Sequence, residues 1–185
     1  MGTLAYIKNF IRDRDVAAIT PSSKFLVKRV CGWIDFSRPC TIVEYGPGTG
    51  VFSTHILSQM TSDSTLLMIE GNEDFVNRIE EDFAGNDPRA ITVHDRAENA
   101  VDILGTHDLG AADYVISGIP FSFLDDEVRA DLLQCTRDIL KDNGKFLVYQ
   151  NYNHMEKPLR KHFGRVKKEY ELRNIPPMFA YEAMK

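Results

Sequence analysis

Glycines and acids at the ends of successive apolar segments give the first sign of chemistry. The turn Glu44-Tyr45-Gly46-Pro47-Gly48-Thr49-Gly50 joins an apolar segment to a helical one. Its glycines let the backbone turn tightly and approach a ligand closely, and the start of the helix presents free N–H groups. The spacing matches neither GxGxxG nor GxxxxGKS/T, and Pro47 lacks an N–H that a pyrophosphate would need. Dinucleotide and P-loop sites are therefore disfavoured.

Two carboxylates follow at the ends of the next two apolar segments. Glu70 lies about 20 residues after the glycine-rich turn, where a carboxylate can accept hydrogen bonds from both ribose hydroxyls. Asp95 ends the third segment, where a carboxylate can accept from an exocyclic amine such as that of adenine. Each acid alone could be a loop cap. Together with the turn they indicate a nucleoside site at one edge of an α/β sheet.

A fourth apolar segment is broken by glycine and proline and then resumes with two aromatics. It reads VISGIPFSFL over 115–124. Gly118 permits a close approach of the backbone, and Pro120 fixes the turn. Phe121 and Phe123 offer an apolar aromatic wall, suited to a cationic or an apolar ligand.

Such residues need a sheet that brings the segment ends to one edge. From residue 41 onward short apolar segments alternate with segments of helical period, which is typical of a parallel sheet with helices on both faces. We expect a closing antiparallel hairpin, joined by Asn174-Ile175-Pro176-Pro177. The predicted strands are 41–46, 65–71, 90–95, 113–118, 145–150, 165–173 and 178–184. The predicted helices are 51–60, 73–84, 97–104, 125–140, which Asn143-Gly144 would end, and 155–163.

The first 40 residues precede the sheet and are predicted to be helical. Leu4, Ile7, Phe10 and Ile11 fall on one face of a helix, with Lys8, Arg12 and Arg14 off it. A break at Thr20-Pro21-Ser22-Ser23 precedes a second helix over 23–33. We expect residues 1–40 to be a helical extension, either a lid or a membrane contact through residues 3–14, and 41–185 to be the catalytic domain.

Chain length, charge distribution and cysteine content favour a single-domain protein and disfavour several other classes. A chain of 185 residues suits a single core. The net charge of −5 divides into +4 for 1–40, −14 for 41–142 and +5 for 143–185, which is poorly suited to wrapping nucleic acid. Three widely spaced cysteines (Cys31, Cys40 and Cys135) indicate neither a disulfide framework nor a metal site. Without a membrane-spanning run or a signal-peptide segment, we expect a cytoplasmic protein, at most peripheral at the inner membrane surface.

The stretch VEYGPGTGVF (43–52) resembles the first motif, E-x-G-x-G-x-G, of class I S-adenosylmethionine-dependent methyltransferases. Glu70 and HDRAEN (94–99) fall where that family has its ribose acid and adenine-binding loop. The resemblance implies a Rossmann-like fold with a terminal hairpin, S-adenosylmethionine as methyl donor and S-adenosylhomocysteine as product. The donor-binding residues it implies are Ser22, Ser23, Glu44, Gly46, Gly48, Thr49, Gly50, Glu70, Asp95, Ala97 and Ser117.

The segment after the fourth strand normally lines the transferred methyl group in that family. Its rRNA adenine dimethyltransferases carry an Asn-Leu-Pro-Tyr or Asn-Ile-Pro-Tyr motif there, whereas this chain has Ser117 and Phe121 at the Asn and Tyr positions. That difference disfavours a flipped adenine. The acceptor-site residues that the resemblance implies are Ser117, Gly118, Ile119, Pro120 and Phe121.

The chain is also similar to small bacterial phospholipid N-methyltransferases of the phosphatidylethanolamine type. The similarity lies in four short motifs: Pro21-Ser22-Ser23, GPGTGVF (46–52), Ser-Gly-Ile-Pro (117–120) and Asn174-Ile175-Pro176-Pro177. A lipid amine must lose a proton before it attacks, because its pKa resembles that of lysine. The candidates to receive that proton are Tyr6, Tyr149, Tyr152 and His154.

Three hypotheses follow from the sequence. The leading one is an N-methyltransferase of phosphatidylethanolamine, a related phospholipid or another small amine. The second is a methyltransferase of RNA adenine or of a small molecule. The third is a donor-binding interaction module without catalysis.

Overall fold

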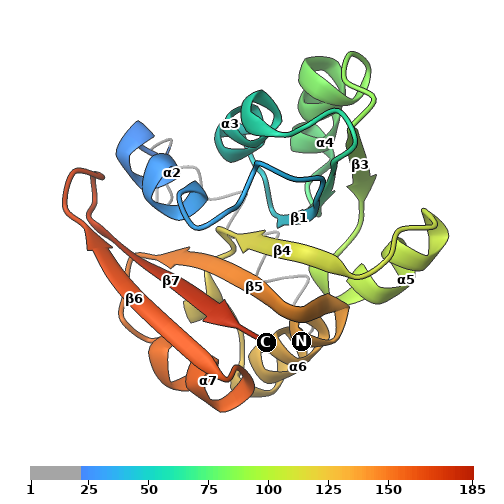
Figure 1. The fold of residues 1–185 in the computed structure, drawn as a ribbon. Helices are drawn as coiled ribbons and strands as arrows, with labels where there is room; N and C mark the ends of the chain where they lie inside the picture. The colour runs from blue at the N-terminus through green and yellow to red at the C-terminus, as the bar shows by residue number, and fades with distance from the viewer. Residues whose placement is uncertain (1–21) are drawn as a thin grey trace.

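The structure is a computed structural model that describes residues 22–185, with Ala84 described by its backbone alone (Figure 1). The helix expected around residues 4–11, the membrane contact of residues 3–14 and Tyr6 lie outside the described residues. The second expected helix is present as α2 (Lys24–Cys31). Ser23 is its N-cap, and the Ser23 hydroxyl accepts a hydrogen bond from the Leu26 N–H at 3.2 Å.

A seven-stranded sheet with the order β3-β2-β1-β4-β5-β7-β6 forms the centre of the molecule. The pairs among β1 to β5 are parallel, and β7 lies antiparallel between β5 and β6. This confirms the expected parallel sheet with a terminal antiparallel hairpin. The strands are β1 (Thr41–Tyr45), β2 (Thr65–Glu70), β3 (Ala90–His94), β4 (Ala112–Ser117), β5 (Leu140–Gln150), β6 (Arg165–Glu171) and β7 (Met178–Met184).

Helices cover both faces of the sheet. Figure 1 shows α2, α3 and α4 on one face and α5, α6 and α7 on the other. Further helices are α3 (Val51–Gln59), α4 (Glu73–Ile79), a π-helical turn η1 (Glu80–Ala84), the 3₁₀ turns η2 (Ala97–Asn99) and η3 (Phe121–Phe123), α5 (Ala100–Thr106), α6 (Asp126–Ile139) and α7 (Glu156–His162).

Alternation along the strands divides the core between the two faces. In β1, Val43 and Tyr45 join the cluster under α5, α6 and α7, while Ile42 joins the cluster under α2 and α3. Every residue of β4 is buried, as expected for a central strand of a parallel sheet. The sheet is therefore rigid at its centre, and the ends of β1 and β4 make a firm base for a site.

One predicted helix stop is wrong. The helix expected over roughly 125–140 ends at Ile139, but β5 follows it directly, so Asn143-Gly144 lies within a strand that was expected to start only at residue 145. Leu140 already has extended backbone angles and pairs with Ala112 of β4. Asn143 adopts a φ of +63° inside β5, where the pairing register of β4 and β5 shifts. Pairing with β4 thus ends the helix, because it satisfies the backbone of residue 140 in the sheet.

Candidate active site

The glycine-rich turn leaves β1 and enters α3 through three glycines with positive φ. Gly46, Gly48 and Gly50 have φ of 64°, 57° and 72°, angles that a residue with a Cβ rarely adopts. A Cβ placed on Gly48 would have no atom within 4 Å, so open space lies beside the turn there. Gly50 is the N-cap of α3 and has no capping side chain. The turn therefore leaves open space beside its backbone at Gly48, and its contact with a ligand stays a prediction.

Glu70, at the end of β2, is joined to this turn by a hydrogen bond. Its Oε2 accepts from the Gly48 N–H at 3.1 Å, and its Oε1 accepts from the Asn72 N–H at 3.0 Å. The side chain is only 6% exposed, and burial raises the pKa of Glu70, although the N–H donors of Gly48 and Asn72 act to lower it. Glu70 is thus held in one place beside the open space.

Asp95 lies next to Glu70, because the Asp95 N–H donates to the Glu70 carbonyl at 3.1 Å. Its Oδ1 accepts from the Arg96 N–H and from Asn99 Nδ2, each at 2.7 Å. Oδ2 has no hydrogen-bond partner among residues 22–185 and remains available to a ligand. Ala97 follows, buried, at the start of η2.

These contacts bring the three predicted parts of the donor site together at one edge of the sheet. The Gly48 N–H donates to the Glu70 carboxylate, and the Asp95 N–H donates to the Glu70 carbonyl. The open space beside Gly48, the ribose-type acid and the unpaired Oδ2 of Asp95 all fit a nucleoside that carries an amino-acid part. Thr49 lies in the same turn, whereas Ser22 and Ser23 lie at the start of α2. The role of all the predicted residues in donor binding stays a prediction.

Glu44 lies beneath the turn rather than at its surface. It is 3% exposed, and its Oε2 accepts from the Ser53 hydroxyl at 2.7 Å. Burial raises the pKa of Glu44 to about 7, the Ser53 hydrogen bond lowers it, and the charge of Glu70 raises it further. Ser53, on α3, was not predicted from the sequence. Together the pair fixes the start of α3 against the end of β1.

The acceptor segment starts at Ser117, the last residue of β4. Ser117 is fully buried, pairs with Tyr45 of β1, and its hydroxyl accepts from the Ile119 N–H at 3.2 Å. The Ile119 side chain lies against Gly46, where a Cβ would be 3.2 Å from Ile119 Cγ1. The acceptor segment and the donor turn are therefore in direct contact. The Ser117 hydroxyl organises the segment, and its contact with the donor stays a prediction.

Gln150, at the end of β5, holds this segment in place and was missed by the sequence analysis. Its Oε1 accepts from the Phe121 N–H at 3.1 Å, and its Nε2 donates to the Ile119 carbonyl at 2.7 Å. The side chain is buried. A polar residue that ends the apolar segment KFLVYQ was the one available signal. Gln150 therefore fixes the backbone on both sides of Pro120.

The two phenylalanines of the segment lie in different environments. The Phe121 ring is fully buried, with its centroid 6.2 Å from that of Phe146 in the core. Phe123 is half-exposed. An open apolar wall in this structure would be formed by Phe123, while Phe121 reaches the site through its backbone. The two rings differ in exposure because the turn η3 directs the side chains of residues 121 and 123 to different sides.

Tyr149 lies at the site, directly beside Gly118. A Cβ on Gly118 would be 2.2 Å from Tyr149 Oη, and the Tyr149 ring stacks on Phe52 at 4.6 Å between centroids. Burial raises the pKa of the Tyr149 phenol, the charge of Glu44 raises it further, and the Ser22 hydroxyl lowers it. The phenol is thus neutral at neutral pH. It can orient an amine but is a poor acceptor for its proton.

The other two described candidates for the proton differ from Tyr149. Tyr152 is 68% exposed. Both ring nitrogens of His154 are buried. Burial followed by the charge of Arg129 lowers the pKa of His154, while a backbone interaction with Tyr152 acts to raise it. His154 is therefore neutral at physiological pH. A neutral imidazole has the chemistry of a proton acceptor.

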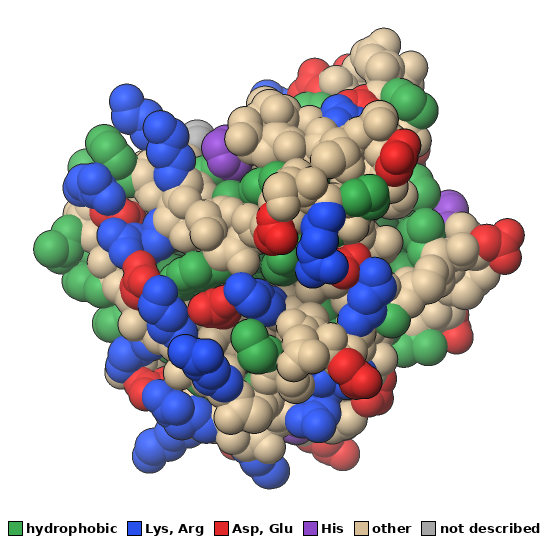
Figure 2. Space-filling model, in the orientation of Figure 1, with side chains coloured by type: hydrophobic (Ala, Val, Ile, Leu, Met, Phe, Trp, Pro, Cys, Tyr) green, Lys and Arg blue, Asp and Glu red, His purple; other side chains and the backbone are tan. Residues whose placement is uncertain are grey.

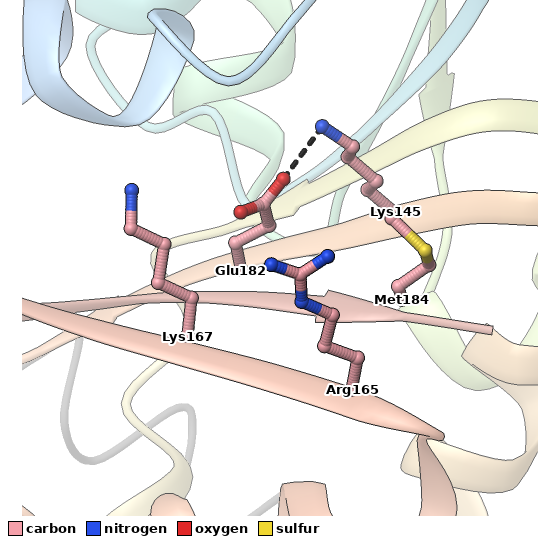
Figure 3. Close-up of a pocket in the computed structure, with 5 residues that line it drawn as sticks. All are labelled: Lys145, Arg165, Lys167, Glu182 and Met184. Atoms are coloured by element: carbon pink, nitrogen blue, oxygen red, sulfur yellow. Dashed lines mark ion pairs between the residues drawn. The ribbon is translucent and has the colours of Figure 1, made fainter.

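A separate hollow lies at the other end of the sheet. Lys145, Arg165, Lys167, Glu182 and Met184 line it, with a volume of about 270 Å³, and Lys145 pairs with Glu182 (Figure 3). Lys145 and Met184 pair with each other, well before β5 reaches Gln150. This hollow is therefore not part of the donor site.

Two further features are absent from the described residues. Over 22–185, no group of three or more His, Cys, Asp or Glu side chains is placed to hold a metal ion. In the same range, no helix combines the length and the apolar character needed to span a bilayer.

Known proteins share the fold of this chain and, at lower levels, its sequence. A methyltransferase small domain is recognised over residues 17–174. The chain is 28% identical over 181 residues to an ornithine lipid N-methyltransferase of Singulisphaera acidiphila, which covers 94% of this chain and 91% of that protein.

Two solved structures show the same fold at low sequence identity. The precorrin-6y C5,15-methyltransferase of Geobacter metallireducens GS-15 has a TM-score of 0.72 at 14% identity, covering 91% of each chain. A SAM-dependent methyltransferase of Aquifex aeolicus has a TM-score of 0.67 at 11% identity, covering 100% of this chain and 99% of that one. The donor, the fold and the enzyme class expected from the sequence are thereby confirmed. The chain belongs to the methyltransferase small domain family and is a class I S-adenosylmethionine-dependent methyltransferase.

Proposed function

We propose that the protein transfers methyl groups to the amine of a lipid head group, with phosphatidylethanolamine or a related phospholipid as its substrate. The observation that carries this proposal is the likeness to an ornithine lipid N-methyltransferase along 94% of the chain. Phosphatidylethanolamine and an ornithine lipid share one feature, a primary amine at the membrane surface. The proposal is therefore strongest for the lipid amine and extends to phosphatidylethanolamine through the motifs at 21–23, 117–120 and 174–177.

The acceptor segment supports an aliphatic amine over a nucleobase. Planar adenine is best held by an amide at the end of β4, where Ser117 stands instead, and its hydroxyl already accepts from the Ile119 N–H. Adenine would also need an exposed ring at the position of the Tyr in the Asn-Ile-Pro-Tyr motif, and the Phe121 ring at that position is buried. An aliphatic amine needs neither feature.

Catalysis in such an enzyme is mainly a matter of alignment. The bound donor supplies a methyl group on a positively charged sulfur, so the new N–C bond forms as the S–C bond breaks. Gly118 lets the Tyr149 hydroxyl lie against the backbone of the acceptor segment, and Gln150 keeps residues 119–121 in position. The neutral Tyr149 hydroxyl can accept a hydrogen bond from the amine. The neutral imidazole of His154 is our candidate for the proton that the amine loses.

The test is a methylation assay with labelled donor and three acceptor sets. Liposomes of anionic lipid would contain phosphatidylethanolamine, ornithine lipid or neither, and an RNA arm would use total rRNA. We expect label in lipid from the first two and none in RNA. Label in RNA but not in lipid would replace the proposal with the RNA alternative. Donor binding by calorimetry without turnover on any acceptor would instead indicate an interaction module.

A further inference from the structure

We propose that the tip of the β6–β7 hairpin and the exposed side of α2 together dock the protein onto an anionic lipid bilayer. This docking tip consists of Leu172, Arg173 and Ile175 on the hairpin and Lys24 and Lys28 on α2. The inference deepens the proposed function, since a lipid substrate is presented by a membrane. It can be measured without any catalysis.

The apolar part of the docking tip consists of two solvent-exposed aliphatic side chains. Leu172 is 71% exposed and Ile175 is 77% exposed, the highest values among the large hydrophobic residues of 22–185. They lie within four positions of each other in one turn. Isolated exposed hydrophobics are ordinary on protein surfaces, but a pair at a protruding tip, next to basic residues, has the form of an interfacial contact.

The tip is held rigidly in place. Asn174, buried between the two aliphatic residues, accepts from the Ser23 N–H at 2.8 Å and donates to the Pro176 carbonyl at 2.7 Å. Glu171 is buried too, and its carboxylate accepts from Arg29 Nε and from Arg173 Nε, both at 2.8 Å. Because these contacts exist before binding, little conformational freedom is lost when the tip meets a surface.

The surroundings of the tip are basic although the protein is acidic. Residues 24–31 and 165–177 contain seven Lys and Arg against two Glu, in a chain of net charge −5. Lys24 and Lys28 are exposed, and the Arg173 guanidinium lies 4.3 Å from the Phe25 ring centroid. Figure 2 shows Lys and Arg side chains beside hydrophobic ones along the edge that α2 and the hairpin form. The basic hollow of Figure 3 continues this charge along β6.

This combination selects a bilayer over the other anionic surfaces. Basic residues alone would suit nucleic acid equally well. Leu172 and Ile175, however, add nothing to contacts with phosphates, whereas they can enter the boundary between head groups and acyl chains while the cations meet anionic head groups.

The docking tip also lies next to the acceptor side of the active site. The Asn174 side chain accepts a hydrogen bond from the Ser23 N–H. The hydroxyl of the adjacent Ser22 hydrogen-bonds the Tyr149 phenol and lowers its pKa. Tyr149 lies against Gly118. A membrane that contacts the tip is therefore close to the residues where an amine would be methylated.

The experiment measures co-sedimentation of the full-length protein, without donor, with phosphatidylglycerol–phosphatidylcholine vesicles and with pure phosphatidylcholine vesicles. We expect wild type to prefer the anionic vesicles and to lose binding as salt is raised. L172D/I175D and, separately, K24E/K28E should each bind about tenfold more weakly or worse. Thermal unfolding and donor binding by calorimetry check that both variants are folded.

Matched controls alter similar residues elsewhere. V101D changes an exposed aliphatic residue on α5, and K157E/K161E makes the same charge change on α7. Both should bind vesicles as wild type does. The proposal is overturned if wild type does not bind anionic vesicles, or if the tip variants bind them as wild type does. It is also overturned if the controls lose vesicle binding to the same extent, or if the tip variants change only the oligomeric state.

The two proposals fail in different ways. Tip-dependent vesicle binding without any methylated lipid would leave docking standing and remove the proposed function. Conversely, wild type could methylate lipid while the tip variants bind vesicles and methylate lipid as wild type does. That result would leave the proposed function standing and remove the docking proposal.

Discussion

The Tyr149 hydroxyl lies so close to Gly118 that a Cβ at position 118 would be 2.2 Å from Tyr149 Oη. Real Cβ atoms do not approach other atoms that closely, so glycine is the residue that fits there. The Tyr149 ring in turn stacks on Phe52, at an interplanar angle of 12°, and Phe52 belongs to the helix that starts at the glycine-rich turn. Tyr149 therefore connects the donor side of the site to the acceptor side.

Replacing Gly118 with alanine should push Tyr149 aside. We expect G118A to lower the free energy of unfolding by about 1–3 kcal/mol, as for other overpacked sites, and to remove most methyl transfer. Urea unfolding and a methylation assay measure the two effects. Because the clash is with one side chain, G118A and Y149A should be non-additive in a double-mutant cycle.

The control for this change is another glycine. A Cβ on Gly105 of α5 would have no atom within 4 Å, so G105A should be neutral or slightly stabilising. Additive effects of G118A and Y149A would show that the contact between the two residues does not matter.

Gln150 should matter for turnover more than for donor binding. Q150A leaves the Phe121 N–H and the Ile119 carbonyl without their partner, which we expect to cost about 1–3 kcal/mol of stability and to lower kcat about tenfold or more. Donor Kd, measured by calorimetry, should change less than about twofold. Q134A, on the exposed side of α6, is the matched control. An equal loss of donor affinity in Q150A would place Gln150 in the donor site instead.

Local sequence signals predicted the elements that position the site. Apolar segments such as 41–45 and 112–117 are buried almost throughout, and periodicity detects such strands. The Pro-Ser-Ser turn correctly indicated the start of α2, because Ser23 caps that helix through a contact three residues away. The acids at the strand ends could also be located from local signals, because the carboxyl ends of parallel strands lie at one edge of the sheet.

The sequence could not reveal contacts that depend on register between distant segments. Gln150 meets residues 119–121 only because β5 lies beside β4 with Ser117 opposite Val148. Tyr149 meets Gly118 for the same reason. The burial of Phe121 and the early start of β5 also depend on tertiary packing, which overrides local preference. The missed parts of the site are thus those fixed by long-range pairing.

Glu70 should be required for donor affinity. E70Q keeps the shape but loses the charge that would accept from two ribose hydroxyls, and it places an amide beside the N–H groups of Gly48 and Asn72. We expect donor Kd to rise about 10- to 100-fold, as for lost hydrogen bonds to a charged group. Calorimetry with S-adenosylhomocysteine measures it. E73Q, an exposed acid at the start of α4, should bind as wild type does. Unchanged affinity in E70Q would remove Glu70 from the donor site.

Glu44 should make the protein less stable as the pH rises toward neutrality. Burial raises its pKa in the folded protein to about 7, from an ordinary value of 4.5. The folded state therefore holds the proton more tightly than the unfolded state does, and the resulting stabilisation is fully present below about pH 4.5 and is lost as the pH rises through about 7. A difference of this size corresponds to about 3 kcal/mol.

The variant E44Q isolates that effect, because its side chain does not ionise. The difference in unfolding free energy between E44Q and wild type should shift in favour of E44Q between about pH 5 and pH 8, measured by urea unfolding at each pH. Glu171 predicts the opposite behaviour, since hydrogen bonds from Arg173 lower its pKa to about 2 despite its burial, and its stabilisation is lost only as the pH falls from 4.5 toward that value. E171Q should therefore lose its disadvantage relative to wild type in acid rather than in base. A constant difference between E44Q and wild type across the whole range would mean that Glu44 titrates normally in the folded protein.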